Sequence, residues 1–517
     1  MASVIESVHQ SAPEGGPSDG GSSRLRRELP FWGALALSLA AMGASLAINI
    51  NPQGSETTVG RAVPLTFVLA TVAVLLVAYG FVRSTSYFNT AGSVYGLTGA
   101  MVGPRAGVVG GWSMMAAYTG STLVTAVTAG IFAGNLLMNL GVWNQTPTIA
   151  PWILALLTLA LVTFLALYPI KRVMTILLGV EIVTTLLILV VGVTVLVRVA
   201  SGSAPNGAHF TLNMFTIPSG VGFSTLFLGV VFGFLSFAGF EASATLGEET
   251  KDPRRGIPMA ILGVAIFGGV FFTVMTAIEL MGFGTDSKGL ASFAASTSLI
   301  GDLGKLYIAS PIGDLVTFGT MVAAIGCCLA SAVPASRLLF AMGRDAASGR
   351  SVARVSARSG EPVVATIAIT GIAALLIVLV RATLTQNIFD LFVWGGTIGV
   401  YFYLVAYALL TAGVWYFLCV RGPRRGVQPR LADRIVPILA LLVVGYTLFR
   451  NAVPWPTTFA LQLCVILAVI WVLIPVVGML LAPGLARRMG QRLANEEGLE
   501  LPGSVVDGVI PRQRPGS

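Results

Sequence analysis

Two glutamate side chains, Glu181 and Glu241, stand well inside long runs of apolar residues. An ionisable group in such a setting is expensive to bury and is usually functional. Because removal from water disfavours the charged form of a carboxyl group, Glu181 could take up a proton or form part of a cation site. A satisfied polar contact between helices is the alternative. For Glu241, a structural role that holds nearby backbone N–H groups is favoured over direct proton transfer.

Two clusters of small residues could interrupt helices and bind charged groups. An unwound turn at Gly43–Ser45 would leave backbone N–H groups free at the start of a half-helix, where a carboxylate is stabilised. A break at Ser236–Gly239 would free carbonyl groups that suit an ammonium group. The two breaks fall in apolar segments five apart, as an inverted repeat of five helices requires. The alternative is that small residues only allow close helix packing.

Other reactive groups are sparse. The four cysteines lie in or beside apolar segments, and His9 and His209 are far apart with no obvious ligand partners. No CxxC pair and no Cys/His cluster occurs, so we predict no metal site, no disulfide framework and no cofactor. Without a metal set or a nucleophile–base pair, the sequence does not indicate an enzyme.

The elements that position these groups are predicted to be membrane helices. Hydrophobic residues make up 55% of the 517 positions and charged residues 10%, far fewer than the roughly 25% of soluble domains. A membrane helix needs roughly 20 apolar residues, which gives about twelve candidates. They are 31–51, 62–82, 104–139, 150–169, 173–199, 222–246, 257–283, 310–342, 362–382, 387–418, 433–450 and 459–482.

The basic residues predict the orientation. With the amino terminus inside, the outer connections hold few of the 31 Lys and Arg residues: Arg61, Arg198, Lys288, Lys305, Arg381 and Arg450. An excess of basic residues on the cytoplasmic side explains the net charge of +9 without invoking nucleic acid. Residues 1–28 and 487–517 are polar and are predicted to be cytoplasmic tails, so both termini lie inside. The amino-terminal segment lacks the apolar core of a cleaved signal peptide.

Several stretches, taken in order, resemble the amino acid–polyamine–organocation (APC) superfamily of permeases. The most specific stretch is Gly239-Phe240-Glu241 followed by the charged run from Glu248 to Pro258. The stretches Ala91–Tyr95, Gly103–Arg105 with Gly111-Trp112, and Ser336–Asp345 agree with other parts of the family pattern. The resemblance covers roughly residues 31–420.

The resemblance implies an all-α membrane protein with a LeuT-type fold. The transporter core would span residues 31–420 and contain two inverted repeats of five helices, about 31–200 and 222–418. Two further membrane helices would occupy residues 433–482.

The resemblance also implies site residues. The substrate carboxylate would bind at Gly43, Ala44 and Ser45, although relatives often carry Gly-Ser-Gly there. The amino group would bind at Leu235, Ser236 and Ala238, where position 235 is often aromatic in relatives. In some relatives a lysine stands at the place of Glu181. Glu181 and Glu241 are therefore the candidate coupling groups.

The coupling ion and the gates are less specific predictions. Cys327, Cys328 and Ser331 lie near the place where sodium-coupled relatives carry hydroxyl groups. Thiols bind hard cations poorly, which favours protons or exchange over sodium. Trp394 and Tyr401 are candidate gates, with packing or interface anchoring as the stronger alternative.

The favoured function is secondary active transport of amino acids across the plasma membrane by alternating access, as symport or antiport. A transporter of polyamines or other organic amines is the first alternative, but a polyamine site needs more carboxylates than the two identified. A membrane sensor that does not transport is the second alternative, although no soluble signalling domain is evident.

Overall fold

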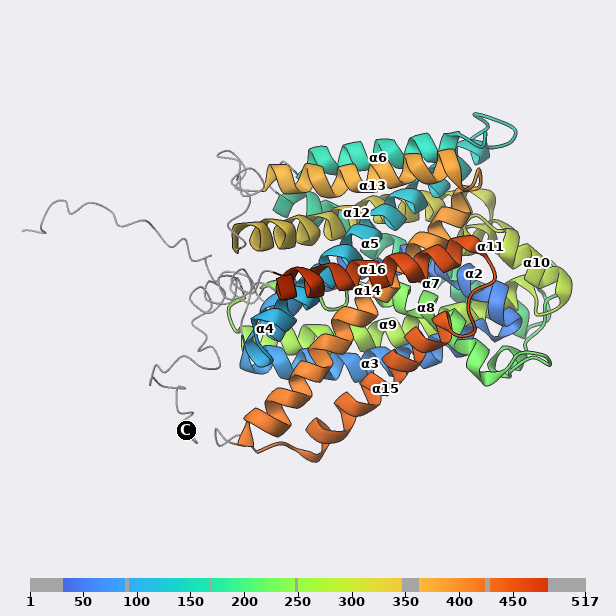
Figure 1. Ribbon diagram of the computed structural model, residues 1–517. Coiled ribbons are helices and arrows are strands. Elements are labelled where there is room, and N and C mark those ends of the chain that lie inside the picture. The colour runs from blue at the N-terminus through green and yellow to red at the C-terminus, as the bar shows by residue number, and fades with distance from the viewer. Residues whose placement is uncertain are drawn as a thin grey trace, which may run out of the picture.

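The computed structural model describes residues 31–88, 93–166, 170–246, 250–345, 362–423 and 428–481. Every long regular element in these ranges is a helix. Both predicted tails lie outside the described residues, as do Ala91, Gly92, Glu248 and Glu249 of the family motifs. The long helices lie side by side in one bundle (Figure 1).

The helices agree closely with the predicted membrane segments. Ten ranges of the described chain are long and apolar enough to cross a membrane, and the first of these, Phe31–Tyr87, has 57 residues and contains two crossings. Ala150–Ala166 is a shorter apolar helix. Adding the second crossing and this shorter helix to the ten ranges gives the twelve crossings predicted. The protein is therefore an all-α, multi-pass membrane protein.

The described chain forms eleven α-helices up to residue 307. These are α1 (Phe31–Met42), α2 (Ala44–Val59), α3 (Val63–Tyr87), α4 (Ser93–Met101), α5 (Pro104–Asn139), α6 (Ala150–Ala166), α7 (Ile170–Ala200), α8 (Phe223–Phe237), α9 (Pro253–Phe283), α10 (Ser287–Ala295) and α11 (Leu299–Tyr307). The remaining helices are α12 (Ser310–Asp345), α13 (Val363–Thr383), α14 (Ile388–Tyr416), α15 (Leu431–Ala452) and α16 (Phe459–Leu481). The short helices α4, α10 and α11 were not predicted, because they lie in connections between crossings.

The core of the bundle forms where α5 packs against α12 and α14, and where α3 packs against α9. Helices α6 and α13 lie together at one edge of the bundle (Figure 1). On α7, Val183, Val190 and Val197 are exposed at intervals of seven residues. That spacing places them on one face of the helix, which suits contact with lipid.

The first and sixth crossings are both interrupted, as predicted. Helix α1 ends at Met42 and α2 begins at Ala44, with Gly43 between them in the left-handed region at φ 54° and ψ 64°. Helix α8 ends at Phe237, and after Gly239 at φ 97° the chain resumes as the 3₁₀ helix η3 (Ala242–Leu246). Both positions favour glycine because a side chain at positive φ is strained.

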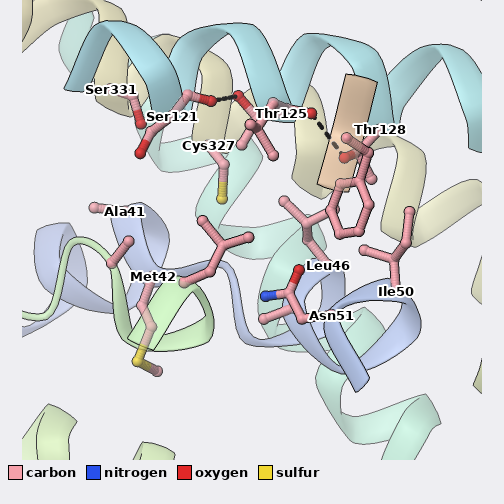
Figure 2. Close-up of a pocket in the computed structure, with 15 residues that line it drawn as sticks. Ala41, Met42, Leu46, Ile50, Asn51, Ser121, Thr125, Thr128, Cys327 and Ser331 are labelled. Atoms are coloured by element: carbon pink, nitrogen blue, oxygen red, sulfur yellow. Dashed lines mark hydrogen bonds between the residues drawn. The ribbon is translucent and has the colours of Figure 1, made fainter. Parts of the chain in front are cut away.

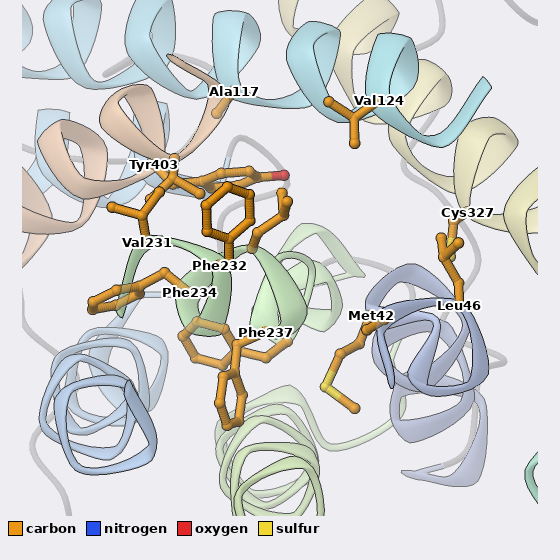
Figure 3. Close-up of a cluster of buried hydrophobic side chains, with 14 of the residues drawn as sticks. Met42, Leu46, Ala117, Val124, Val231, Phe232, Phe234, Phe237, Cys327 and Tyr403 are labelled. Atoms are coloured by element: carbon orange, nitrogen blue, oxygen red, sulfur yellow. The ribbon is translucent and has the colours of Figure 1, made fainter. Parts of the chain in front are cut away.

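The two breaks lie against each other. A Cβ atom added at Gly239 would collide with the backbone of Ala41, in the last turn of α1. The backbone N–H of Ser243 donates a 2.9 Å hydrogen bond to the hydroxyl of Ser38. Around the breaks, Met42 and Phe237 belong to one cluster of buried apolar side chains (Figure 3). The breaks are thus held inside the protein, where their free backbone groups can be satisfied.

An ion pair joins helix α15 to the core. The carboxylate of Asp433 is fully buried and accepts hydrogen bonds from Arg83 Nε at 2.7 Å, Arg83 Nη2 at 3.0 Å and the Tyr79 hydroxyl at 2.6 Å. It also accepts a bond from the backbone N–H of Arg430 at the start of α15.

Replacing Asp433 with Asn should destabilise the protein. The Arg83 guanidinium would lose its counter-charge, and breaking a buried ion pair in this way costs about 3 kcal/mol. The loss should appear as a lower melting temperature of the purified protein in detergent. Tyr79→Phe is the matched control, because it removes one hydrogen bond worth about 1 kcal/mol and leaves the ion pair intact. Equal melting temperatures for the two variants would show that the ion pair does not hold α15 in place.

Candidate functional site

A small cavity lies where the two broken helices face α5, α12 and α14 (Figure 2). Its volume is about 30 Å³ in this conformation, enough for only a few water molecules. Most of its walls are apolar, from Ala41, Met42, Leu46, Ala47, Ile50, Val124, Leu235, Ala238, Cys327 and Phe392. The polar lining residues are Asn51, Ser121, Thr125, Thr128 and Ser331. None of the lining residues carries a charge.

The hydroxyl groups on α5 form a row along one side of this cavity (Figure 2). Thr125 Oγ1 donates to the carbonyl of Ser121 at 2.6 Å, and Thr128 Oγ1 donates to that of Val124 at 2.7 Å. Because the hydroxyl protons are used within the helix, these oxygens retain lone pairs. They can accept hydrogen bonds from a donor in the cavity, such as an ammonium group.

The sixth-crossing residues predicted to bind substrate are at the cavity or next to it. Leu235 and Ala238 both line it. Ser236 does not, but its hydroxyl accepts a 2.8 Å hydrogen bond from the side-chain amide of Asn51 on α2, which does. This bond joins the two broken helices beside the cavity.

The first-crossing residues predicted to bind the substrate carboxylate face a different group. Gly43, Ala44 and Ser45 are not among the residues that line the cavity. Instead, Glu181 on α7 approaches the start of α2, where its Oε1 accepts from the Ser45 N–H at 2.9 Å and its Oε2 accepts from the Ser45 hydroxyl at 2.6 Å. The Ala44 N–H and the Thr185 side chain also contribute hydrogen bonds to this carboxyl group. The protein's own carboxylate thus occupies the positive end of the half-helix.

Glu241 lies at the other break, in a cluster of aromatic rings. Its two carboxylate oxygens accept hydrogen bonds from the hydroxyls of Tyr118 on α5 at 3.2 Å and Tyr407 on α14 at 2.9 Å. Phe240 and Phe81 pack edge-on against the Tyr407 ring and against each other. These contacts tie the break after α8 to two core helices, which fits the structural interpretation of Glu241.

Two asparagines on α2 connect the site to the rest of the bundle, and neither was predicted from the sequence. Asn49 donates to Thr320 Oγ1 on α12 at 3.1 Å and accepts from the Ile300 N–H on α11 at 2.9 Å. Asn51 bonds to Ser236, as described above. The signal was present in the sequence, since Asn49 and Asn51 are polar side chains within the predicted crossing 31–51.

A larger cavity of about 690 Å³ lies next to the first one. Ile50 borders both cavities, while Phe392 lines the small one and Phe389 the large one. The rings of Phe389 and Phe392 are 5.3 Å apart, and Phe232 lies 6.3 Å from Phe392. Ile50, Phe389 and Phe392 therefore lie between the larger cavity and the narrow central cavity.

The predicted gates lie elsewhere. Neither Trp394 nor Tyr401 lines either cavity. The carbonyl of Trp394 accepts a hydrogen bond from the thiol of Cys464 on α16, and Tyr401 is buried. Both positions suit packing of α14 against its neighbours.

Metal-binding side chains are not assembled in the described part of the chain. No group of three or more His, Cys, Asp or Glu residues there could hold a metal ion, and the four cysteines are free thiols. The Cys327 thiol donates to the carbonyl of Ala40, and the Cys328 thiol donates to that of Thr122.

A bundle of membrane helices with two broken helices around a central cavity defines an integral membrane protein of the transporter class. Residues 34–481 match the model of the amino acid permease family, and the chain belongs to that family.

Three curated relatives show the breadth of the similarity. A branched-chain amino acid permease, BcaP, from Lactococcus lactis is 24% identical over 63% of this chain and 70% of its own length. A low-affinity putrescine importer, PlaP, from Escherichia coli K12 is 26% identical over 62% of this chain and 68% of its own length. A vacuolar cationic amino acid transporter 4 from Arabidopsis thaliana is 27% identical over 69% and 59%, respectively.

Proposed function

We propose that the protein is a secondary transporter that carries neutral, aliphatic amino acids across the plasma membrane by alternating access. The observation that carries this proposal is the central cavity between the two broken helices, with its apolar walls and uncharged polar groups. A substrate side chain would contact Met42, Leu46, Val124 and Leu235, which are apolar lining residues. Its ammonium group would bind hydroxyl oxygens of α5 and carbonyl groups at the break near Ala238. Both termini would lie in the cytoplasm.

The absence of charged residues from the cavity lining argues against a polyamine as the substrate. A polyamine carries two or more positive charges, and each charge buried without a partner is costly. No carboxylate lines the cavity to pair with them. The branched-chain amino acid permease among the relatives also fits an aliphatic substrate better than a polyamine, whereas the putrescine importer supports the alternative.

Glu181 provides a mechanism for proton coupling within this proposal. A substrate carboxylate and an ionised Glu181 would compete for the same N–H groups at the start of α2 and would repel each other. A proton on Glu181 removes that repulsion and weakens its bonds to Ser45, which frees the N–H groups for the substrate. Proton symport or exchange follows, and the thiols of Cys327 and Cys328 disfavour a sodium site beside them.

The domain boundaries, the role of Glu241 and the gates are further parts of this proposal. The chain would divide into repeats at 31–200 and 222–418, followed by the two helices within 433–482. Glu241 would act as a coupling group only if its bonds to Tyr118 and Tyr407 change during the cycle. Gating is better assigned to Phe392 than to Trp394 or Tyr401, because Phe392 lines the central cavity.

Counterflow in proteoliposomes tests the proposal. Vesicles loaded with unlabelled leucine, isoleucine and valine, without any ion gradient, should accumulate labelled leucine. Labelled lysine, glutamate and putrescine should accumulate at most about a tenth as well, since a missing ion-pair partner costs more than 1.4 kcal/mol. Accumulation of putrescine in place of leucine, in vesicles loaded with unlabelled putrescine, would support the organic amine alternative. No counterflow of any of these compounds by folded protein would reject the transport proposal and favour a sensor.

A further inference from the structure

A third carboxyl group inside the membrane region, Glu279 on α9, was not identified from the sequence. Its side chain is fully buried, with 0% exposed surface. Neither carboxyl oxygen has a hydrogen-bond partner among the described residues. This separates Glu279 from Glu181 and Glu241, whose oxygens are all bonded.

The face of α9 around Glu279 offers no counter-charge. The residues three, four and seven positions earlier, which share this face, are Thr276, Met275 and Phe272. The hydroxyl of Thr276 is also buried and unpartnered in the described structure. Met275 packs toward Gly192 of α7, and the Phe272 ring packs on Phe67 and Phe237. A metal cation needs several oxygen ligands, and this face supplies one carboxyl group and one hydroxyl.

The charged and titratable groups on the helices that pack against α9 do not provide Glu279 with a partner among the described residues. On α7, Glu181 binds Ser45, and Arg198 lies near Tyr307 at the far end of the helix. On α11, Lys305 pairs with Asp302 and with Asp314 of α12, and Tyr307 donates to the Gly282 carbonyl. Arg83 of α3 pairs with Asp433. The others on these helices whose side chains are described are Glu56 of α2, Lys288 of α10 and the tyrosines Tyr79 and Tyr87 of α3. None of these groups is bonded to Glu279.

An ionised carboxylate in this setting would carry an uncompensated buried charge, which is far more costly than a neutral carboxyl group. One proton removes that charge without any further ligand. We propose that Glu279 is a proton-binding site separate from Glu181, which carries a proton in this conformation and releases it in another state of the transport cycle. This inference rests on the proposed transport function.

The position of Glu279 provides a route for that release. It lies four residues, or about 6 Å, before the end of α9 at Phe283. That end is covered by Leu303 of α11 and Val195 of α7, which flank Gly282, and by Phe293 of α10, whose ring lies 5.7 Å from that of Phe283. Separation of α10 and α11 from α9 would admit water to the carboxyl group.

The test compares Glu279→Gln with the wild-type protein in proteoliposomes. Leucine uptake and proton uptake are measured together under an imposed pH gradient, and counterflow is measured without one. Glutamine mimics the protonated acid, so counterflow should persist. Accumulation driven by a gradient of one pH unit should fall about tenfold, because each proton lost from the cycle removes one factor of ten. The measured ratio of protons to leucine should fall by one.

Glu56→Gln is the matched control, because it makes the same chemical change at a partly exposed position on α2, and it should leave the ratio unchanged. An unchanged ratio in Glu279→Gln would overturn the inference, as would loss of counterflow in a folded variant. A fall only in sodium-driven uptake would also overturn it.

If Glu279→Gln does not fold, a second variant, Glu279→Asp, replaces it. This variant should retain the wild-type ratio of protons to leucine but show an altered pH dependence of uptake. A pH dependence equal to that of the wild type would overturn the inference. Failure of the transport proposal is recognised separately, because the wild-type protein would then show no counterflow.

Discussion

Glu181→Gln should abolish most proton-driven accumulation of substrate and leave counterflow largely intact. The carboxylate of Glu181 accepts hydrogen bonds from both the N–H and the hydroxyl of Ser45. A glutamine amide cannot change its charge, so the competition between substrate and Glu181 would no longer depend on a proton. Accumulation driven by a gradient of one pH unit should fall about tenfold or more. The measurement is leucine uptake into proteoliposomes with and without the gradient.

Ser45→Ala is the matched control for this variant. It removes the 2.6 Å bond from the hydroxyl to Glu181 but keeps the backbone N–H and the titratable carboxyl group. Proton-driven accumulation should therefore persist, with an affinity for substrate changed by less than about tenfold, as expected for one hydrogen bond. If Glu181→Gln accumulates leucine under the pH gradient to the same level as the wild type, Glu181 is only a polar contact between α7 and α2.

Gly43→Ala should slow transport at least tenfold. Gly43 has a φ of 54°, a conformation that costs other residues about 1–2 kcal/mol. A Cβ atom at this position would also collide with Sγ of Cys327 on α12. The chain would have to shift at the break that separates α1 from α2, and the start of α2 would move away from Glu181. Initial rates of counterflow should fall at least tenfold, by about 1.4 kcal/mol or more.

Removing the sulfur atom of Cys327 separates the effect of the steric collision from the effect of the backbone strain. In the double variant Gly43→Ala with Cys327→Ala, the added Cβ no longer meets Sγ, and only the strain of the left-handed backbone remains. The double variant should therefore recover part of the counterflow rate, and Cys327→Ala alone should be close to the wild type. Equal loss in the single and double variants would assign the whole effect to backbone conformation. Full activity of Gly43→Ala would show that the break does not need a left-handed residue.

The membrane crossings were readable from the sequence because lipid imposes a local rule. Each crossing must be a long apolar helix, so its composition alone identifies it. The predicted segment 104–139 coincides with α5, and the predicted 459–482 differs by one residue from α16. The breaks were also predicted, from the clusters of small residues at Gly43–Ser45 and Ser236–Gly239, and the structure places Gly43 and Gly239 at positive φ.

The partners of the buried carboxyl groups were decided by the tertiary structure. Glu181 and Ser45 are 136 residues apart, and Glu241 lies 123 residues from Tyr118 and 166 from Tyr407. No local pattern relates such positions. The N–H groups of Ala44 and Ser45 were predicted to be free for substrate, but the packing of α7 beside the break brings Glu181 to them.

Glu279 shows the limit of the sequence most plainly. Its residue type and its place in an apolar segment were visible, but it lies near the end of a predicted crossing, where a carboxylate could reach water. Only the packing of α7, α10 and α11 around the end of α9 shows that the group is buried without a partner. The sequence by itself determined which segments enter the membrane and where two of them break. The tertiary structure decided which charges are satisfied, because burial and pairing depend on contacts between helices far apart in the chain.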